Sequence, residues 1–207
     1  MITNIASEAT GMTSNAFLVA GPPGVRTPAT DDDGDAGRRV LVDTGANFDA
    51  PAAVREHVDD LDAVVLTHTH PDHVGTLPAL REAFDVATWG YDTSHDAVDR
   101  EIPDGGTTRL GTGTFEALHT PGHKDDHLCL FDRDSGVLFA GDLVFANGAF
   151  GRTDLAEGDR DLLVDSVDRL REWVGDDVTA IHTGHGRSIV DGPAESLELS
   201  ARAARMR

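Results

Sequence analysis

Residues 66–75 read LTHTHPDHVG and place three histidines and one aspartate within six positions. The whole chain of 207 residues has only 10 histidines, so this density is unusual. One interpretation is a polar turn after a strand, because histidine tolerates turn conformations. The other is one half of a metal site, since two imidazoles two residues apart on extended backbone project to the same side.

Further side chains able to bind a metal follow the ends of other expected strands. The stretch HTPGH ends at His123, FAGD ends at Asp142 and IHTGH ends at His185. Loops at strand ends are held by a rigid scaffold, which can direct several ligands to one point. The order HxHxDH, HTPGH, GD and GH along one chain therefore indicates a metal site. The candidate ligands are His68, His70, Asp72, His73, His123, Asp142 and His185.

Five imidazoles and two carboxylates make a nitrogen and oxygen donor set. Such a set suits Zn²⁺, Fe²⁺ or Mn²⁺, and the lack of thiolates argues against a closed structural zinc site. The single cysteine, Cys129, lies in the apolar stretch LCLF and is expected to be a buried core thiol. His119 and His182 lie short of the motif positions and are expected to be structural. His57 and His95 are expected at the surface.

The hydrophobic pattern predicts strands in two groups, interleaved with helices. Apolar runs predict strands at 15–20, 38–43, 62–67, 85–89, 113–119, 127–132, 136–142 and 178–185. Periodic apolar residues and prolines at first helical positions predict helices at 48–58, 71–84, 159–174 and 193–207. These elements predict an α+β fold in which two sheets pack together and are covered by helices.

The length of the chain predicts a single domain over residues 1–207. Within it, residues 21–37 are rich in glycine, proline and aspartate, which predicts a flexible acidic loop. The sequence has no apolar run of about 18 residues and no recognisable signal peptide, so we expect a cytoplasmic protein without a membrane span. A homo-oligomer remains open.

Charge is the second unusual feature. The chain has 17 basic and 37 acidic residues, a formal net charge of −20, and Lys124 is its single lysine. This charge repels phosphate, so neither a nucleic acid nor an anionic membrane is an expected partner. The chain also repels itself unless salt screens the charges, and the Debye length falls to about 3 Å at 1 M salt. The composition therefore predicts a halophilic protein from a salty cytoplasm.

From about Asn15 to His185, the ordered motifs resemble those of the metallo-β-lactamase superfamily. The resemblance implies an αββα four-layer sandwich, two mixed β-sheets flanked by helices. It implies two divalent metal ions, most simply zinc, with iron or manganese as alternatives. It assigns the first ion to His68, His70 and His123, and the second to Asp72, His73 and His185, with Asp142 bridging the two. It also implies that Asp43, in VLVDTG, lies beneath the metal loop, where a carboxylate would orient a ligand imidazole.

A metal-held water has a pKa near 7 in favourable sites, which supplies hydroxide without a serine or cysteine nucleophile. No Gly-x-Ser-x-Gly motif is present, so a serine hydrolase is not expected. The expected reaction is hydrolysis of an activated acyl bond, with Asp72 and Asp142 as the catalytic carboxylates. The stretch GDLVFANGAFGRTDLAEGD resembles the glyoxalase II-like branch, which implies a small thioester as the substrate.

Two cations are candidate substrate-binding residues. Arg152, in GRTD, could meet a substrate carboxylate as a bidentate donor, or it could pair internally with Asp154. Lys124 is the second candidate. It belongs to HTPGHKDDHL, which departs from the family pattern after the third histidine. This departure, and the lack of the further helical domain of full-length glyoxalase II after His185, weigh against glutathione itself as the thiol.

Two alternatives remain at this point. A mononuclear iron persulfide dioxygenase shares these motifs and the GRTD region, and it retains all seven ligand positions with one metal. A non-catalytic metal-binding protein on the same fold is the alternative from another class. A nuclease is disfavoured because the charge of −20 opposes the approach of phosphate.

Overall fold

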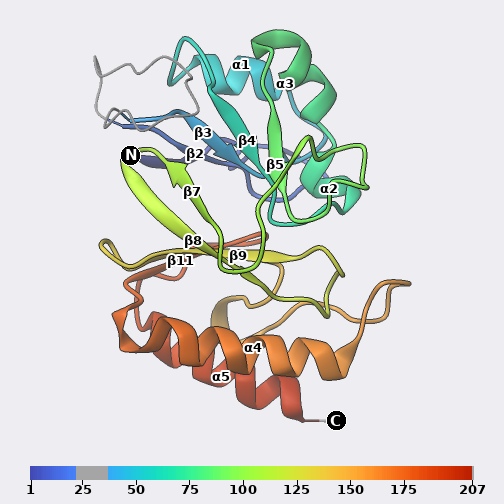
Figure 1. Cartoon of the computed structure of the whole chain (residues 1–207), viewed down its shortest axis with the longest axis vertical. Helices are drawn as coiled ribbons and strands as arrows, with labels where there is room; N and C mark the ends of the chain where they lie inside the picture. Colours follow the sequence, from blue (N-terminus) through green and yellow to red (C-terminus); the bar gives the residue numbers. More distant parts are fainter. Residues whose placement is uncertain (22–36, 207) are drawn as a thin grey trace.

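The computed structural model describes residues 1–21 and 37–206, so nearly all of the loop predicted at 21–37 lies outside the described residues. The described strands form two mixed β-sheets (Figure 1). The first sheet consists of β1 (Ile2–Asn4), β2 (Phe17–Val19), β3 (Val40–Val42), β4 (Ala63–Val65), β5 (Thr88–Gly90) and β6 (Arg100–Glu101), in that order. Its β1, β2 and β3 are antiparallel, and β3 to β6 are parallel.

The second sheet has the strand order β11-β10-β9-β8-β7. Its strands are β7 (Thr107–Leu110), β8 (Gly113–His119), β9 (Leu128–Asp132), β10 (Val137–Gly141) and β11 (Ala180–Thr183). Strands β10 and β11 are parallel, and the other neighbours are antiparallel. The short strands β1, β6 and β7 were not predicted from the sequence.

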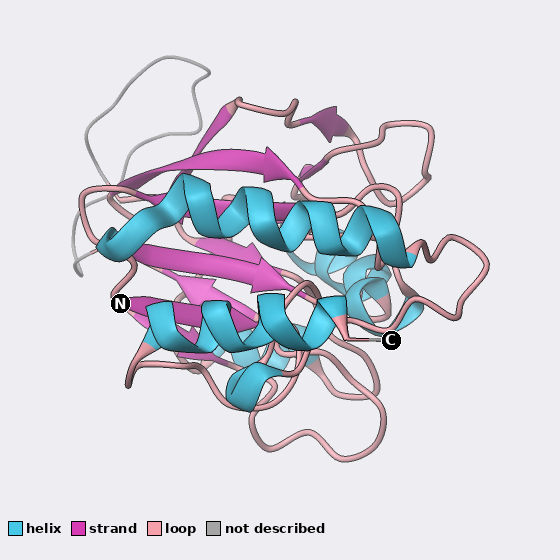
Figure 2. Cartoon of the chain, turned by 90° about the horizontal axis from the view of Figure 1, so that it is seen from below, coloured by secondary structure: helices cyan, strands magenta, loops and turns pink. Residues whose placement is uncertain are grey.

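Helices cover the outer face of each sheet. Figure 1 shows α1 (Ala50–Arg55) and α3 (Leu77–Phe84) over the first sheet, with α2 (Pro71–Val74) near its edge. The second sheet is covered by α4 (Arg160–Val174) and α5 (Pro193–Arg205), which lie side by side across its strands (Figure 2). No helix among the described residues is both long and apolar enough to cross a bilayer.

Alternating side chains along the strands create three apolar layers. In the first sheet, Leu18, Leu41 and Val64 pack toward α1 and α3. The residues next to them along each strand face the second sheet and form the middle layer. From the first sheet this layer contains Phe17, Val19, Val40, Val42, Ala63 and Val65, and from the second sheet it contains Phe115, Leu128, Leu130 and Phe139. In the second sheet, the alternate residues Cys129, Phe131, Leu138 and Ala140 pack toward α4 and α5. Three apolar layers between four structural layers give the predicted αββα sandwich.

The helix predicted at 71–84 is instead two helices, α2 and α3, with a break at Gly75 and Thr76. Two backbone facts explain the break. The carbonyl of His73 accepts hydrogen bonds from the backbone N–H and the hydroxyl of Thr44, so it is diverted from the helical ladder. Pro78, four residues after Val74, has no N–H to donate to the carbonyl of Val74.

The N-terminus of α4 holds the HTPGH loop against the second sheet. The backbone N–H of Asp159 donates to the carbonyl of Gly122 at 2.8 Å, and the hydroxyl of Ser166 donates to the carbonyl of Pro121 at 2.6 Å. Gly122 has a φ of +128°, and a Cβ there would lie 2.2 Å from the backbone nitrogen of Leu163. The loop can approach the helix this closely only with glycine at 122.

We predict that Asp159→Ala lowers the free energy of unfolding by about 1 kcal/mol. The Asp159 side chain caps α4 by accepting from the backbone N–H groups of Asp161 and Leu162 at 2.9 and 3.0 Å. Urea unfolding followed by circular dichroism measures the change. Asp165→Ala is the matched control, because Asp165 is an exposed carboxylate in the same helix. Equal losses in the two variants would mean that the cap contributes nothing.

Candidate metal centre

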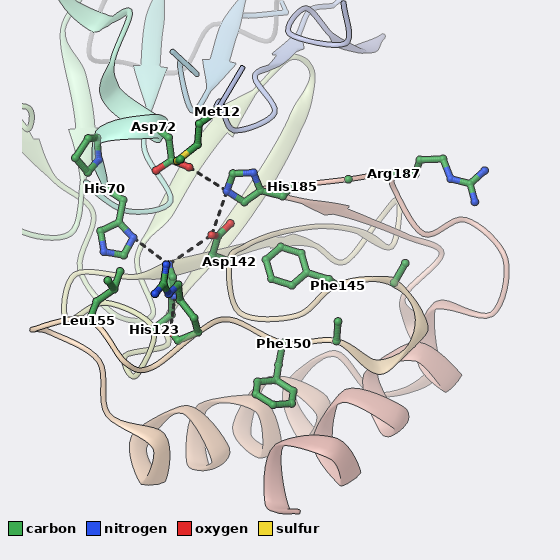
Figure 3. Close-up of a pocket in the computed structure, with 15 residues that line it drawn as sticks. Met12, His70, Asp72, His123, Asp142, Phe145, Phe150, Leu155, His185 and Arg187 are labelled. Atoms are coloured by element: carbon green, nitrogen blue, oxygen red, sulfur yellow. Dashed lines mark hydrogen bonds and ion pairs between the residues drawn. The ribbon is translucent and has the colours of Figure 1, made fainter. Parts of the chain in front are cut away.

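The seven candidate ligands come from four segments that follow strand ends. His68 and His70 follow β4, and Asp72 and His73 occupy the first turn of α2, which begins at Pro71. The other three come from the second half of the chain: His123 lies in the loop after β8, Asp142 directly follows β10, and His185 follows β11. The structure brings all seven side chains into one cluster, part of which is drawn in Figure 3.

Three histidines form the first group. Nε2 of His68 lies 3.1 Å from Nδ1 of His70, which lies 3.0 Å from Nε2 of His123. Metal–imidazole bonds of about 2.0–2.1 Å place two nitrogens of a tetrahedral zinc centre about 3.3 Å apart. The observed spacing is close to this value, so the three nitrogens fit a single ion.

Asp142 connects the first group to a second one. Its Oδ2 lies 3.4 Å from Nε2 of His123 and 3.4 Å from Nε2 of His185. Its Oδ1 lies 3.4 Å from Nε2 of His73. Asp72 completes the second group, with Oδ2 3.1 Å from Nε2 of His185. Both oxygens of Asp142 therefore face ligand-type nitrogens, the position that a bridging carboxylate needs.

Neighbouring groups fix which nitrogen of each imidazole is free. Asp43 accepts hydrogen bonds from the backbone N–H and the hydroxyl of Thr67, both at 2.8 Å. Its Oδ2 also lies 3.0 Å from Nδ1 of His73, and the hydroxyl of Thr67 lies 3.1 Å from Nδ1 of His68. These contacts hold the Nδ1 proton of both rings and leave Nε2 free, which is how metal-ligating histidines are usually oriented.

His123 is oriented in the same way from the opposite side of the cluster. Its Nδ1 lies 2.8 Å from the carbonyl oxygen of Arg152, so Nδ1 donates and Nε2 is left free. Among the described residues, three buried polar atoms have no hydrogen-bond partner at this site: Nε2 of His70, Nε2 of His73 and Oδ1 of Asp142. Buried polar atoms are rarely left unpaired in native proteins. The unpaired Nε2 of His73 and Oδ1 of Asp142, which face the cluster, and the donor chemistry fit one or more divalent ions.

The pKa values of the cluster describe how protons are distributed without metal. Burial, together with His73 and His127, holds the pKa of His68 well below its usual value. Hydrogen bonds to Asp142 and Asp72 raise the pKa of His185 to about 9. Burial lowers the pKa of His73, but Asp43 and Asp142 outweigh burial and raise it to about 10.

These directions have a consequence for metal binding. His73 and His185 carry protons at neutral pH when no metal is bound, and a metal ligand must be neutral imidazole. Burial raises the pKa of Asp142, but the close contacts with His185 and His73 hold it well below its usual value, so its carboxylate stays charged. Metal binding would therefore release protons and weaken as the pH falls.

His127 supports the backbone of Asp142, a role that the sequence did not suggest. Its Nε2 accepts a hydrogen bond from the backbone N–H of Asp142 at 3.0 Å, and its Nδ1 lies 2.7 Å from the hydroxyl of Thr120. His127 is fully buried, and burial together with His123 holds its pKa well below the usual value. The neutral ring thus fixes the turn at Gly141, whose φ is +46°. The available signal for this role in the sequence was a histidine four residues after His123, directly before the apolar strand β9.

The other histidines lie away from the cluster. His119 stacks on Tyr91 with ring centroids 3.8 Å apart. His182 packs against Phe17 and Phe139, and burial lowers its pKa to about 4. The exposed positions of His57 and His95, and the burial of Cys129, agree with the sequence-based expectations.

The two cations predicted to bind substrate differ in position. Lys124 is buried, and its ammonium lies 2.8 Å from Asp125 and 3.5 Å from Asp126; it does not line the cavity at the cluster. Arg152 lines that cavity with a side chain that is 61% exposed. Its guanidinium forms two hydrogen bonds to Asp154, at 2.7 and 2.8 Å, so the internal pair considered from the sequence is present.

A cavity of about 700 Å³ opens directly onto the cluster. His70, Asp72, His123, Asp142 and His185 line one part of it, and apolar side chains line another (Figure 3). A concave site in which convergent polar donors meet an apolar wall is the usual form of a small-molecule site.

The family follows from the fold, the donor cluster and comparisons with known proteins. A family model described as the metallo-beta-lactamase superfamily matches residues 32–185. The chain belongs to the metallo-β-lactamase superfamily. Its relatives identify it as a hydrolase of this superfamily. Proteins with this fold bind divalent metals, and the cluster of histidines and aspartates fits such a site.

Three relatives illustrate the similarity. The hydroxyacylglutathione hydrolase GloC of Haemophilus influenzae is 30% identical over 73% of this chain and 82% of its own length. An atrochrysone carboxyl ACP thioesterase of Aspergillus fumigatus is 31% identical over 83% of this chain, which spans only 41% of that longer protein. The crystal structure of TTHA1623 in a di-iron-bound form superimposes with a TM-score of 0.70, at 28% identity, over 98% of this chain and 97% of that one.

We predict that Gly184→Ala abolishes metal binding at the bridging carboxylate while the fold survives. A Cβ at 184 would lie 2.0 Å from Oδ1 of Asp142 and 2.8 Å from the ring of His73, so both groups must move. Zinc titration by calorimetry measures binding, and circular dichroism checks the fold.

Gly186→Asn is the matched control in the same loop. A Cβ there meets no atom within 4 Å, and asparagine tolerates the positive φ of 76°. If Gly184→Ala bound zinc with the affinity and stoichiometry of the parent, the proposed crowding of Asp142 would be wrong.

Proposed function

We propose that the protein is a metal-dependent thioester hydrolase of the glyoxalase II type. The observation that carries the proposal is the opening of a cavity of about 700 Å³ onto the convergent histidines and aspartates. The relatives named as hydroxyacylglutathione hydrolase and ACP thioesterase support the same reaction class. The position of Arg152 at the cavity, within the GRTD stretch, agrees with it.

The proposed ligand assignment divides the cluster into two ion sites. His68, His70 and His123 would hold one divalent ion, Asp72, His73 and His185 would hold a second, and Asp142 would be shared. We propose zinc, with iron or manganese as alternatives. Divalent ions bound there would supply a Lewis acid and activate water at neutral pH.

The chain's own carboxylates would then orient water and substrate. In thioester hydrolysis the carbonyl carbon forms a bond to the water oxygen, the carbon–sulfur bond breaks, and a proton from the water ends on the leaving thiolate. Asp72 lies at the cavity with its side chain 24% exposed, so its oxygens are accessible to water as proton acceptors. Asp142 is nearly buried, and its role is to fix the donors on both sides of it.

Arg152 is the proposed contact for an anionic group on the substrate. Its pairing with Asp154 keeps the guanidinium at the cavity in a fixed orientation, and the exposed pair can exchange Asp154 for a substrate carboxylate. Lys124 points to its own aspartates, so we propose for it a supporting role in the loop after His123 and no substrate contact.

The central experiment tests turnover by the metal-loaded protein. We expect release of thiol from a panel of small thioesters, in about 1 M KCl so that the acidic surface is screened. Asp142→Ala should lower kcat/KM by more than about a hundredfold, since even residues that only support a metal ligand cost about 10–100-fold. Asp165→Ala, an exposed aspartate on α4, is the control.

Metal analysis of the same samples shows whether a lack of turnover is due to a lack of metal or to a different function. Full metal content with no thioester turnover would contradict the proposal and favour a non-catalytic metal-binding protein. Turnover by Asp142→Ala at the parent rate would contradict the two-metal assignment.

A persulfide dioxygenase remains the second candidate, because the histidine group of His68, His70 and His123 could hold a single ion. The iron-loaded protein distinguishes the two functions. A hydrolase cleaves thioesters under anaerobic conditions and takes up no oxygen with a persulfide. Oxygen uptake with glutathione persulfide, without anaerobic thioester cleavage, would establish the second candidate.

A further inference from the structure

Apolar side chains supply much of the lining of the cavity beside the metal donors: Met12, Phe145, Ala146, Ala149, Phe150 and Leu155. Four of these residues, Phe145, Ala146, Ala149 and Phe150, belong to the loop that follows Asp142, and we call this loop the apolar wall. Figure 3 shows Phe145 next to Asp142 and Phe150 beyond it. The ring centroids of Phe145 and His185 are 6.3 Å apart. A group bound at the donors on this side would therefore lie close to the wall.

The wall is built into the fold and does not need to form on binding. The backbone N–H of Phe145 donates to the carbonyl of Ala149 at 2.8 Å, and Val144 and Phe150 pair as an antiparallel bridge. Two helices brace this loop. Ser200 on α5 donates to the carbonyl of Ala149 at 2.9 Å, and the guanidinium of Arg160 on α4 lies 4.2 Å from the ring centre of Phe150. A preorganised surface of this kind loses little entropy when a ligand binds.

The loop that forms the wall also follows the donor Asp142 directly in the sequence. Asp142, the carboxylate shared by both donor groups, is followed directly by the loop that carries Phe145 and Phe150. The backbone N–H of Gly151 returns to the carbonyl of Leu143 at 3.2 Å, which closes the loop next to the donors. The part of a substrate nearest the scissile bond therefore lies against these side chains.

The cavity offers few partners to a polar acyl group. None of the lining residues in the described chain is a serine, threonine, asparagine, glutamine or tyrosine. Apart from the metal donors, its polar side chains are Arg152, which is paired with Asp154, and Arg187. Figure 3 shows the Arg187 guanidinium turned away from the donors. Against the apolar wall, away from the metal donors and Arg152, a hydroxyl on the acyl group would meet no polar side chain of the described lining, which is unfavourable.

We propose that the cavity selects thioesters with an apolar acyl group, alkanoyl or aroyl and larger than acetyl, over small hydroxyacyl thioesters. The inference rests on the proposed thioester hydrolysis and names the substrate class for it. The acyl group lies against Phe145 and Phe150, and the thiol carrier extends toward the open side of the cavity. Phe145 and Ala149 are specificity-determining residues in this arrangement, because the first supplies the wall and the second leaves space in front of it.

The test uses thioesters of N-acetylcysteamine, so that the carrier is constant and uncharged. The acyl groups are acetyl, lactoyl, butanoyl, hexanoyl and benzoyl, and the enzyme is the zinc-loaded full chain. We expect kcat/KM to rise by about threefold for each added methylene, the size of effect that burial of one methylene supports. Lactoyl should be a poorer substrate than butanoyl, which has no hydroxyl.

Two variants test the wall. Phe145→Ala removes apolar surface, and Ala149→Phe fills the space in front of it at an exposed position. Each should lower the ratio of the hexanoyl to the acetyl kcat/KM by about tenfold, since each removes burial of several methylenes. Leu162→Ala, an exposed apolar residue on α4, is the matched control and should keep the parent ratio.

Binding of the carboxylic acid products gives a readout that does not need turnover. Hexanoate should bind the zinc-loaded protein about tenfold or more tightly than acetate, and Ala149→Phe should remove the difference. Equal kcat/KM values for all acyl groups, or faster lactoyl than butanoyl cleavage, would overturn the inference and leave thioester hydrolysis intact. No cleavage of any thioester by metal-loaded protein would overturn the proposed hydrolysis, and with it the inference.

Discussion

The carboxylate of Asp43 is the contact on which the metal donors depend. It follows β3 directly and accepts from Thr67, just after β4, and from His73 in α2. Three segments are thus fixed by one side chain that is 4% exposed. Asp43 itself has a φ of 57°, a conformation that few residues other than glycine adopt and that surrounding contacts must hold in place. Without this carboxylate, His73 would lose the partner that keeps its Nε2 directed at Asp142.

His123, Asp142 and His185 are positioned by the second sheet, so the donor cluster needs both sheets. Strands β10 and β11 run parallel, and the N–H of Gly184 donates to the carbonyl of Gly141 at 2.7 Å. This pairing delivers Asp142 and His185 as one unit. The α4 contacts with Pro121 and Gly122 deliver His123. Since the middle apolar layer locks the sheets together, the donors from the two halves meet at a fixed spacing.

Much of this arrangement was predictable from the sequence, because the motifs lie where the hydrophobic pattern ends. The strands that precede His68, His123, Asp142 and His185 were each predicted within a few residues, because each carries buried apolar side chains. The fold class was confirmed. The αββα prediction drew on a resemblance as well as on periodicity, since alternation alone predicts two-faced strands without saying which sheets pair.

The rest depended on contacts that no local pattern encodes. The break after α2 arises partly because Thr44, 29 positions earlier in the sequence, donates a hydrogen bond to the carbonyl of His73. His127 looks like a departure from a motif, and only its contact with the N–H of Asp142 shows what it supports. Strand β6 consists of two exposed residues, which have no apolar signature. The cavity lining likewise brings Met12 together with Phe145 and Leu155, from which it is more than 130 positions away in the sequence.

The loop from Leu143 to Gly151 separates two kinds of change. Its backbone hydrogen bonds are made within the loop, to Ala140 in β10 and to Ser200 on α5, and none of its side chains belongs to the donor cluster. Substitution of its exposed side chains would therefore change the lining of the cavity while leaving the donor side chains in place.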